Sequence, residues 1–337
     1  MNTYDPNTLY SKPKKKKSGK KGPVIFLAIL AVLLGIGIAA NTGLKDYFGI
    51  GTKDEYKYDA DYIGVLEIHG TMSSDGSDPA YSQAWLLERI EDMIYDDYNK
   101  GLMLSIDTPG GSVYTTDELY LKIREYQNKT KRPVYTYMES MAASGGYYIS
   151  APTDKIYANR NCWTGSIGVT VGTVYDISGF LEDLGITTVT ITAGDNKAMG
   201  SSTEPLTEEQ KAIYQGLVDE AYEQFVQIVS EGRKMKKSKV IELADGRIYT
   251  AKQAKENGLV DEIGTRDEAV SDMKIHYDLL NCDVEVMSYE PEFSLGSWLV
   301  GLADDLKSGA KNEYNQIMQL MAENNKFTIT YMSEARK

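Results

Sequence analysis

The fold is decided by residues 102–138, which read LMLSIDTPGGSVYTTDELYLKIREYQNKTKRPVYTYM. The apolar run Leu102–Ile106 predicts a buried strand, Thr116–Gln127 predicts a helix, and Val134–Met138 predicts a second strand. A strand, a crossover helix and a second strand are the unit from which parallel sheets are built. The segment therefore predicts an α/β domain with a largely parallel sheet.

The alternation of strands and helices continues on both sides of this segment. Upstream, Asp61–His69 predicts a strand, and Gln83–Tyr98 predicts an amphipathic helix for which Ser82 is a suitable N-cap. Downstream, the pattern predicts a helix at Ala142–Ile149, strands at Lys155–Ala158 and Thr187–Thr192, and helices at Thr207–Lys234, Ala251–Asn257 and Thr265–Tyr277. We therefore expect one α/β domain over residues 61–290.

The first 40 residues have a different character. Residues 1–23 form a basic stub with seven lysines and one acid, Asp5. Residues 24–40 are 17 small or apolar residues without a charge. A membrane-spanning helix needs about 17–25 such residues, whereas the core of a cleavable signal peptide has about 7–15, so we expect a retained transmembrane anchor. The lysines predict a cytoplasmic N-terminus and an extracytoplasmic domain, joined to the cell membrane anchor by a linker at residues 41–60.

Composition narrows the function classes. The chain of 337 residues has a net charge of −13 although its basic stub is positive, so the external part is strongly acidic. Such a surface disfavours nucleic acid and anionic lipid as partners. Cys162 and Cys282 could form a single disulfide outside the cell, which sequence alone leaves open, and two cysteines exclude a disulfide scaffold.

Residues 291–337 are predicted to form a C-terminal helix and a tail. One face of this helix holds apolar residues at spacings of three and four, namely Leu295, Trp298, Leu299, Leu302 and Leu306. Core packing is the simpler explanation of the stripe, and an interface with a second subunit is the competing one.

Histidine chemistry has little support in the sequence. The chain has two histidines, His69 and His276, and neither belongs to a cluster with metal-ligand spacing. The phosphate-binding pattern GxxxxGK[ST] is absent as well. We therefore expect no metal and no cofactor, and a Ser-His-Asp triad would have to recruit one of these two histidines.

Three segments hold the residue types of a hydrolase active site. The first is DTPGGSV at Asp107–Val113, which follows a predicted strand and contains Gly110 and Gly111. Consecutive glycines let a backbone approach a ligand and turn N–H groups toward it, as an oxyanion hole requires. An ordinary tight turn would use the same residues.

The second segment is SMAASGGYY at Ser140–Tyr148, which places Ser144 among alanines and glycines after a strand. A nucleophile at a strand-to-helix turn needs small neighbours because the substrate carbonyl must reach its oxygen. The N–H of Gly145 would then be an oxyanion donor. A helix start selected for close packing explains the segment equally well.

The third segment is AGDNKAMGSS at Ala193–Ser202, a loop with one lysine, Lys197. A lysine acts as a general base only while it is uncharged, so this residue would have to be removed from water. Taken by itself, an exposed loop lysine is the simpler interpretation.

In this order, the segments resemble a known family. DTPGGSV, AASGGYYI at 142–149 and TGSIGV at 164–169 are similar to motifs of the bacterial signal peptide peptidases. The resemblance implies a Clp/crotonase-like fold with repeated ββα units, preceded by a single transmembrane helix. It covers about residues 60–280 and also the basic stub and the anchor before them.

The resemblance implies a Ser/Lys dyad. By position it makes Ser144 the nucleophile and Lys197 the general base. It gives the oxyanion hole the N–H groups of Gly111 and Gly145, and it assigns Ser166 to orienting the lysine. The lead-in to Lys197, Gly-Asp-Asn, departs from the family, in which this stretch is basic or aromatic.

The chain is of the half-length kind. In double-length members the lysine comes from the first repeat and the serine from the second. The resemblance therefore implies a ring-shaped homo-oligomer in which Ser144 of one subunit meets Lys197 of its neighbour. It implies a membrane-anchored serine endopeptidase that degrades remnant signal peptides and other apolar peptides. The alternatives are a catalytically silent scaffold of the same fold and a crotonase-type acyl-thioester enzyme.

Overall fold

The computed structural model of the chain describes residues 58–291. The strands are β1 (Tyr62–His69), β2 (Asn99–Thr108), β3 (Val134–Ala143), β4 (Lys155–Ala158), β5 (Trp163–Gly165), β6 (Ile248–Thr250), β7 (Glu262–Ile263) and β8 (Asp283–Met287). The helices are α3 (Gln83–Tyr95), α4 (Val113–Thr130), α5 (Gly145–Ser150), α6 (Ser178–Asp183), α7 (Glu208–Gly232), α8 (Lys237–Leu243), α9 (Ala251–Glu256) and α10 (Arg266–His276).

Several predicted segments lie outside the described residues. They are the basic stub, the transmembrane anchor, nearly all of the linker and the apolar stripe of the C-terminal helix. Within residues 58–291, no helix combines the length and the apolar character that a membrane crossing requires.

The strands form one sheet with the neighbour order β6-β5-β3-β2-β1-β8, as the alternating pattern predicts for an α/β fold. All neighbouring pairs are parallel except β5 with β6. On one edge of β3, Tyr135–Met138 pairs with β4 and Met141–Ala143 pairs with β5. The register between β2 and β3 shifts at the same level, between Ile106 and Thr108. The last residues of β3 thus leave β4 and lead directly to Ser144.

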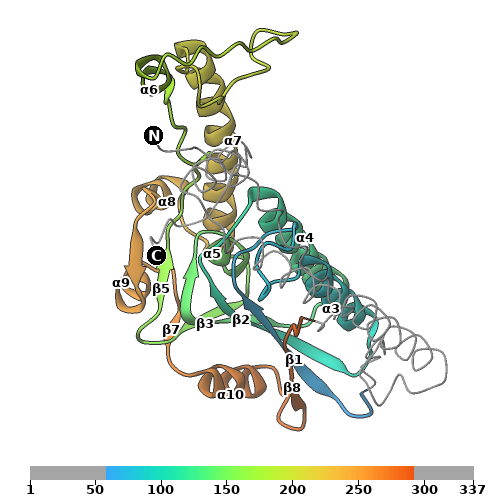
Figure 1. Ribbon diagram of the computed structural model, residues 1–337. Helices are drawn as coiled ribbons and strands as arrows, with labels where there is room; N and C mark the ends of the chain where they lie inside the picture. Colours follow the sequence, from blue (N-terminus) through green and yellow to red (C-terminus); the bar gives the residue numbers. More distant parts are fainter. Residues whose placement is uncertain (1–57, 292–337) are drawn as a thin grey trace, which may run out of the picture. The chain divides into compact units, whose positions relative to one another are not determined.

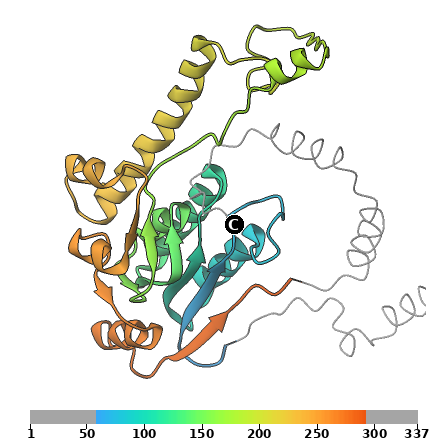
Figure 2. The same ribbon diagram turned by 60° about the vertical axis from the view of Figure 1, so that its left-hand side comes forward.

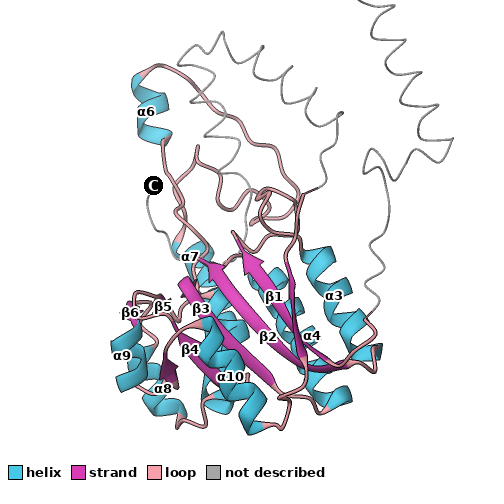
Figure 3. Ribbon diagram, turned by 90° about the horizontal axis from the view of Figure 1, so that it is seen from below, coloured by secondary structure: helices cyan, strands magenta, loops and turns pink. Residues whose placement is uncertain are grey.

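Helices cover both faces of this sheet (Figure 1, Figure 3). Helices α3, α4, α5 and α7 pack on one face, where Leu66 and Ile106 belong to the larger hydrophobic core. Helix α10 packs on the other face, over Val65 and Met103. Because both faces are covered, the central strands are buried almost throughout, which explains their continuous apolar runs.

One predicted helix proves to be partly strand. Ala142–Ile149 was expected to be helical, but Ala142 and Ala143 are the end of β3 and α5 begins at Gly145. The physical reason is the short strand β5, whose Thr164 and Gly165 pair with these two alanines. Other boundaries are confirmed closely, among them β4 and the Ser82 cap of α3, whose hydroxyl accepts the N–H of Trp85.

Residues 168–207 form an arm between β5 and α7. Figure 2 shows this arm beyond the outer end of α7, away from the sheet. None of its residues is buried, and the predicted strand Thr187–Thr192 is wrong, since the segment has no regular structure. Val189 is 79% exposed and Ile191 is 92% exposed. A β-branched run becomes a strand only when a partner strand pairs with it, and within the described chain this run has none.

Candidate active site

Ser144 occupies the turn between β3 and α5 in a strained backbone conformation. Its φ is 56° and its ψ is −112°, although positive φ is uncommon for any residue other than glycine. Its N–H donates to the carbonyl of Gly165 over 2.7 Å, and its carbonyl accepts the N–H of Tyr148 over 2.9 Å. The residue is 1% exposed. Strain of this kind persists where the surroundings enforce it, which is typical of functional sites.

Three glycines bring the β2–α4 loop against the start of α5. A Cβ on Gly145 would lie 2.7 Å from Oγ1 of Thr116 and 3.2 Å from Cα of Gly110. A Cβ on Gly111 would lie 1.9 Å from the carbonyl oxygen of Met72. No side chain fits at either place, so the sequence must have glycine there for the loop and the turn to meet.

The predicted oxyanion donors therefore come together in one chain. Around Gly111, the N–H of Gly110 donates to Thr108 Oγ1 over 3.1 Å and the N–H of Ser112 donates to the Met72 carbonyl over 3.0 Å. Within residues 58–291, no hydrogen bond uses the N–H of Gly111 or that of Gly145. Both N–H groups are thus without an acceptor in the described part of the chain.

Asp107, near the end of β2, binds the last part of β3, a role that the sequence alone did not suggest. Its Oδ1 accepts the hydroxyl of Ser140 over 2.6 Å and the N–H of Met141 over 3.0 Å. These donors lie where the register shift separates β3 from β2, so the carboxylate replaces the missing ladder bonds. A carboxylate near a strand end, two residues before Pro-Gly-Gly, was the available signal.

Two tyrosines fix helix α5. The hydroxyl of Tyr147 donates to the carbonyl of Leu259 over 2.9 Å, and that of Tyr148 donates to Asp117 Oδ1 over 2.6 Å. Burial raises the pKa of Tyr147, so its hydroxyl stays protonated and remains a donor. The helix that begins at Gly145 is therefore anchored on two sides.

Ser166 is the residue after Gly165, whose carbonyl accepts the N–H of Ser144. It has a φ of 48°, is 8% exposed, and donates its N–H to the carbonyl of Arg247 over 2.8 Å. Within the described residues its hydroxyl has no hydrogen bond. The structure thus places Ser166 beside the Ser144 turn, and its role in orienting the lysine stays a prediction.

Lys197 is not brought to Ser144 within one chain. It is exposed on the arm, and the side chain of its neighbour Asn196 donates to Glu209 over 3.3 Å at the start of α7. Helix α7 meets α5 much later, where Gln224 donates to the Tyr148 hydroxyl over 2.7 Å. The two contacts are about 15 residues apart, or about 23 Å along the helix axis. Serine and lysine of the same chain are therefore widely separated.

The other reactive side chains have other partners. Nε2 of His69 lies 3.2 Å from Oε1 of Glu139, on the sheet face that α10 covers. Cys162 and Cys282 are buried free thiols, so the disulfide left open by the sequence is not formed. Burial raises the pKa of Cys162 to about 12, so this thiol is protonated and unreactive near neutral pH.

Comparison with known proteins places this geometry in a family. Residues 126–280 match peptidase family S49. A protein of Enterococcus faecium assigned as signal peptide peptidase SppA is 38% identical over 70% of each chain. A protein of Methanocaldococcus jannaschii assigned as a protease is 33% identical over 88% of this chain and 93% of its own length. Protease 4 of Haemophilus influenzae is 33% identical over 74% of this chain but only 41% of its own length.

Proposed function

The chain belongs to peptidase family S49 and is a serine peptidase of the signal peptide peptidase family, and on that premise we propose that it is an endopeptidase with a Ser/Lys dyad. In this proposal Ser144 is the nucleophile and Lys197 of a neighbouring subunit is the general base. The observation that carries it is the buried, strained turn at Ser144, which is followed by the unused N–H of Gly145 and packs close to the loop that contains Gly111.

The reaction begins when Ser144 Oγ attacks the carbonyl carbon of the scissile bond and its proton passes to the uncharged Nζ of Lys197. The carbonyl oxygen becomes an oxyanion, to which Gly111 and Gly145 donate their N–H groups. Lysine then gives the proton to the leaving amine, and the C–N bond breaks to leave an acyl-enzyme. Water attacks the ester carbonyl of this intermediate and gives a proton to Lys197, which passes it to Ser144 Oγ as the ester bond breaks and the carboxylic acid product leaves. The Ser166 hydroxyl accepts a hydrogen bond from Lys197 and orients it.

Assembly of subunits supplies the lysine. The exposed apolar side chains of the arm would become buried against a neighbour; they are Val174, Tyr175, Phe180, Leu184, Ile186, Val189 and Ile191. Their burial would also remove water from Lys197, which an uncharged lysine requires. An arm that reaches a different surface of the next subunit makes a head-to-tail contact, and such contacts close into a ring when the rotation permits.

Apolar peptides are the proposed substrates, remnant signal peptides above all. Trp163 on β5 is 53% exposed, and it pairs with Met141 three residues before the nucleophile. Ile248 on β6 is 42% exposed and pairs with Gly165, whose carbonyl holds the serine N–H. These side chains offer an apolar surface beside Ser144. The anchor at residues 24–40 would keep this site at the outer surface of the cell membrane, where apolar peptides accumulate.

The proposal is tested with the full-length chain in detergent and an internally quenched apolar peptide. We expect cleavage by the wild type and a loss of about 10⁴–10⁶-fold in kcat for Ser144→Ala. A fluorophosphonate should label the wild type and the control Ser73→Ala, whose serine pairs with Ser77 on the surface. Labelling of Ser144→Ala at the wild-type rate would assign the nucleophile to another residue.

A further inference from the structure

Helix α10 covers only part of its sheet face. It begins at Arg266, and the strand residues beneath it are apolar, among them Val65 and Met103. Two residues further along the strands, the same face becomes polar, because Glu67 pairs with Ser105 and Ser105 pairs with Tyr137. The strands thus continue past the end of the helix and leave a polar area uncovered.

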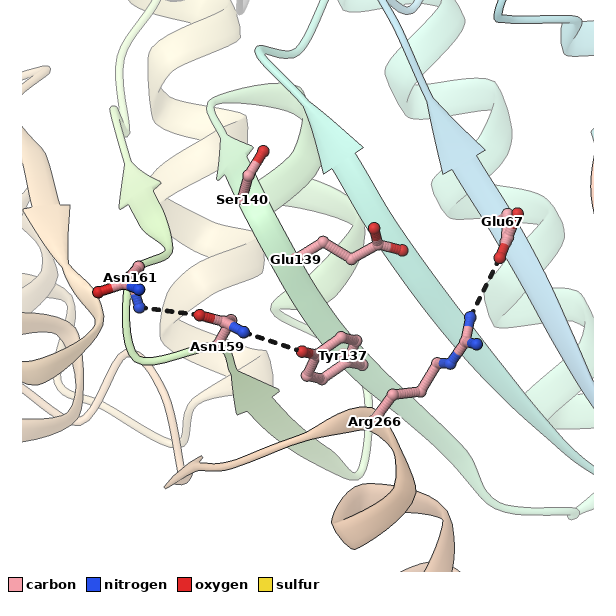
Figure 4. A pocket seen from close by; sticks show the side chains of 7 residues that line it. All are labelled: Glu67, Tyr137, Glu139, Ser140, Asn159, Asn161 and Arg266. Carbon is pink, nitrogen blue, oxygen red and sulfur yellow. Dashed lines mark hydrogen bonds and ion pairs between the residues drawn. The ribbon is translucent and has the colours of Figure 1, made fainter.

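A pocket of about 460 Å³ opens in this area. It is lined by Glu67, Tyr137, Glu139, Ser140, Asn159, Asn161 and Arg266. Figure 4 shows Glu67 on β1 and Glu139 on β3 on either side of the intervening strand β2, with Arg266 extending toward Glu67. The lining is formed by charged residues, amides and hydroxyls, so a polar ligand fits it better than an apolar one.

The two carboxylates of the pocket differ in their partners. Arg266 Nη1 donates to Glu67 Oε1 over 3.1 Å, so the positive charge of Arg266 compensates the negative charge of Glu67. Oε1 of Glu139 accepts the Ser105 hydroxyl over 2.7 Å and lies 3.2 Å from His69 Nε2. Within residues 58–291 no lysine or arginine binds Glu139, and its Oε2 has no hydrogen bond. A half-buried carboxylate with one unused oxygen is well suited to a cation.

Anionic ligands and metal ions fit the pocket poorly. The N-terminus of α10 is closed by a capping box in which Thr265 and Glu268 satisfy each other's backbone N–H groups. The guanidinium of Arg266 is engaged with Glu67. Among the described residues, no group of three or more His, Cys, Asp or Glu side chains is arranged to hold a metal ion. An organic cation remains as the ligand that the charges favour.

We propose that this pocket binds the cationic side chain of a lysine or arginine in the peptide substrate. Glu139 Oε2 accepts the ammonium or guanidinium group, and the oxygens of Ser140, Tyr137 and Asn161 offer further acceptors. This assignment rests on the proposed peptidase function. Signal peptides combine a positively charged segment with an apolar run, so a basic subsite beside an apolar one would select that class of substrate.

The pocket lies within reach of a bound peptide. Glu139 lies on β3, five residues before Ser144 in the turn that follows this strand, which corresponds to about 16 Å for extended chain. An extended substrate with its scissile carbonyl at Ser144 spans the same length with about five residues. The basic residue should therefore stand four to six residues from the scissile bond.

The test is a peptide series cleaved by the full-length chain. One lysine is moved through an apolar quenched peptide, and each member is compared with its norleucine counterpart, which has a similar length and no charge. We expect kcat/KM of the wild type to favour lysine about tenfold at one distance from the scissile bond. Glu139→Gln should reduce that ratio to about one, and Glu139→Lys should favour glutamate at the same position.

The control is Glu285→Gln, which changes a carboxylate on β8 that pairs with Gly64, and it should keep the wild-type ratio. Cleavage of every peptide with no preference for lysine at any position would overturn the pocket assignment and leave the peptidase function intact. A preference that persists in Glu139→Gln would do the same. A chain that cleaves none of the peptides would instead contradict the proposed function.

Discussion

The turn at Ser144 and the arm at Lys197 are opposite in physical character. The turn is closed: Ser144 is 1% exposed, its backbone is held on both sides, and Gly111 and Gly145 lie where no side chain fits. The arm is open, since none of residues 168–207 is buried and Ile191 is 92% exposed. A single chain therefore holds the proposed nucleophile and oxyanion donors in a tightly packed turn but leaves the proposed base, Lys197, exposed to water.

This contrast explains how a half-length chain could be kept inactive until it assembles. A lysine in water is charged and cannot accept the serine proton. Docking of the arm on a neighbouring subunit would bury Lys197 and at the same time bring it to the Ser144 turn of that subunit. Activity would then depend on assembly, while the fold of the turn would not.

Removal of Lys197 should cause the largest loss of activity among the variants that test this contrast. Lys197→Ala and Lys197→Arg should both lower kcat by about 10⁴-fold, since alanine has no base and a guanidinium stays protonated. Circular dichroism and thermal unfolding should match the wild type, because the residue is exposed. The control is Lys252→Ala, a lysine whose side chain is 82% exposed on α9. Wild-type turnover by Lys197→Arg would show that the base is another residue.

A substitution in the tightly packed region around the Ser144 turn should lower both activity and stability. In Gly111→Ala the added Cβ would overlap the Met72 carbonyl, so the loop must move and its N–H must leave the oxyanion position. We expect kcat to fall by about 10²-fold and the melting temperature to decrease. Gly101→Ala, on the strand β2 that precedes this loop, is the control, because the nearest neighbours of its Cβ would be 3.4 Å away. Equal effects of the two variants would contradict the assignment of Gly111.

A substitution in the open region should cost assembly and spare the fold. Ile191→Glu should reduce the oligomer fraction and the specific activity about tenfold, while the unfolding free energy of the separated chain changes by less than about 0.5 kcal/mol. Leu280→Glu is the control, since it places the same charge on an apolar residue that is 64% exposed outside the arm. Mass photometry and calorimetry measure the two quantities. Wild-type assembly by Ile191→Glu would remove the arm from the interface.

The smallest expected effect concerns the thiol beside the turn. Because burial raises the pKa of Cys162 to about 12, only about one thiol in 10⁴ is ionised at pH 8. Iodoacetamide should leave Cys162 unmodified in the folded protein and alkylate it after unfolding, as mass spectrometry of the peptides would show. Since deprotonation is favoured only in the unfolded state, this thiol should also lower stability as pH rises from about 8.5 toward 12. Rapid alkylation of the native protein would show that the closed region opens.

Local patterns were sufficient for much of the fold. Apolar runs identified β1, β2 and β4, and the capping residue Ser82 marked the start of α3. The short strands β5 to β8 were missed, because runs of two to five residues become strands only through pairing with distant partners. The same cause explains why Ala142 and Ala143 were predicted as helix.

The candidate site likewise contains some features that local sequence patterns indicated and others that depend on distant parts of the chain. Small residues around Ser144 were interpreted as a nucleophile turn or as a helix start selected for close packing, and the tight surroundings of Gly145 confirm the close packing. The role of Asp107 and the pocket at Glu139 depend on strand register, which no local pattern specifies. In the proposed ring the environment of Lys197 would depend on a second chain, so neither the sequence nor a single subunit would display it.

The central claim is that an active site unites Ser144 of one subunit with Lys197 of the next. It is tested by co-assembly of Ser144→Ala and Lys197→Ala chains, each inactive by itself, in equal amounts, with mixed oligomers verified by native mass spectrometry. In a ring with random mixing, one interface in four joins an intact serine to an intact lysine, so activity should return to about a quarter of the wild-type value. Mixed oligomers without any recovery would place both residues in the same chain and contradict the account.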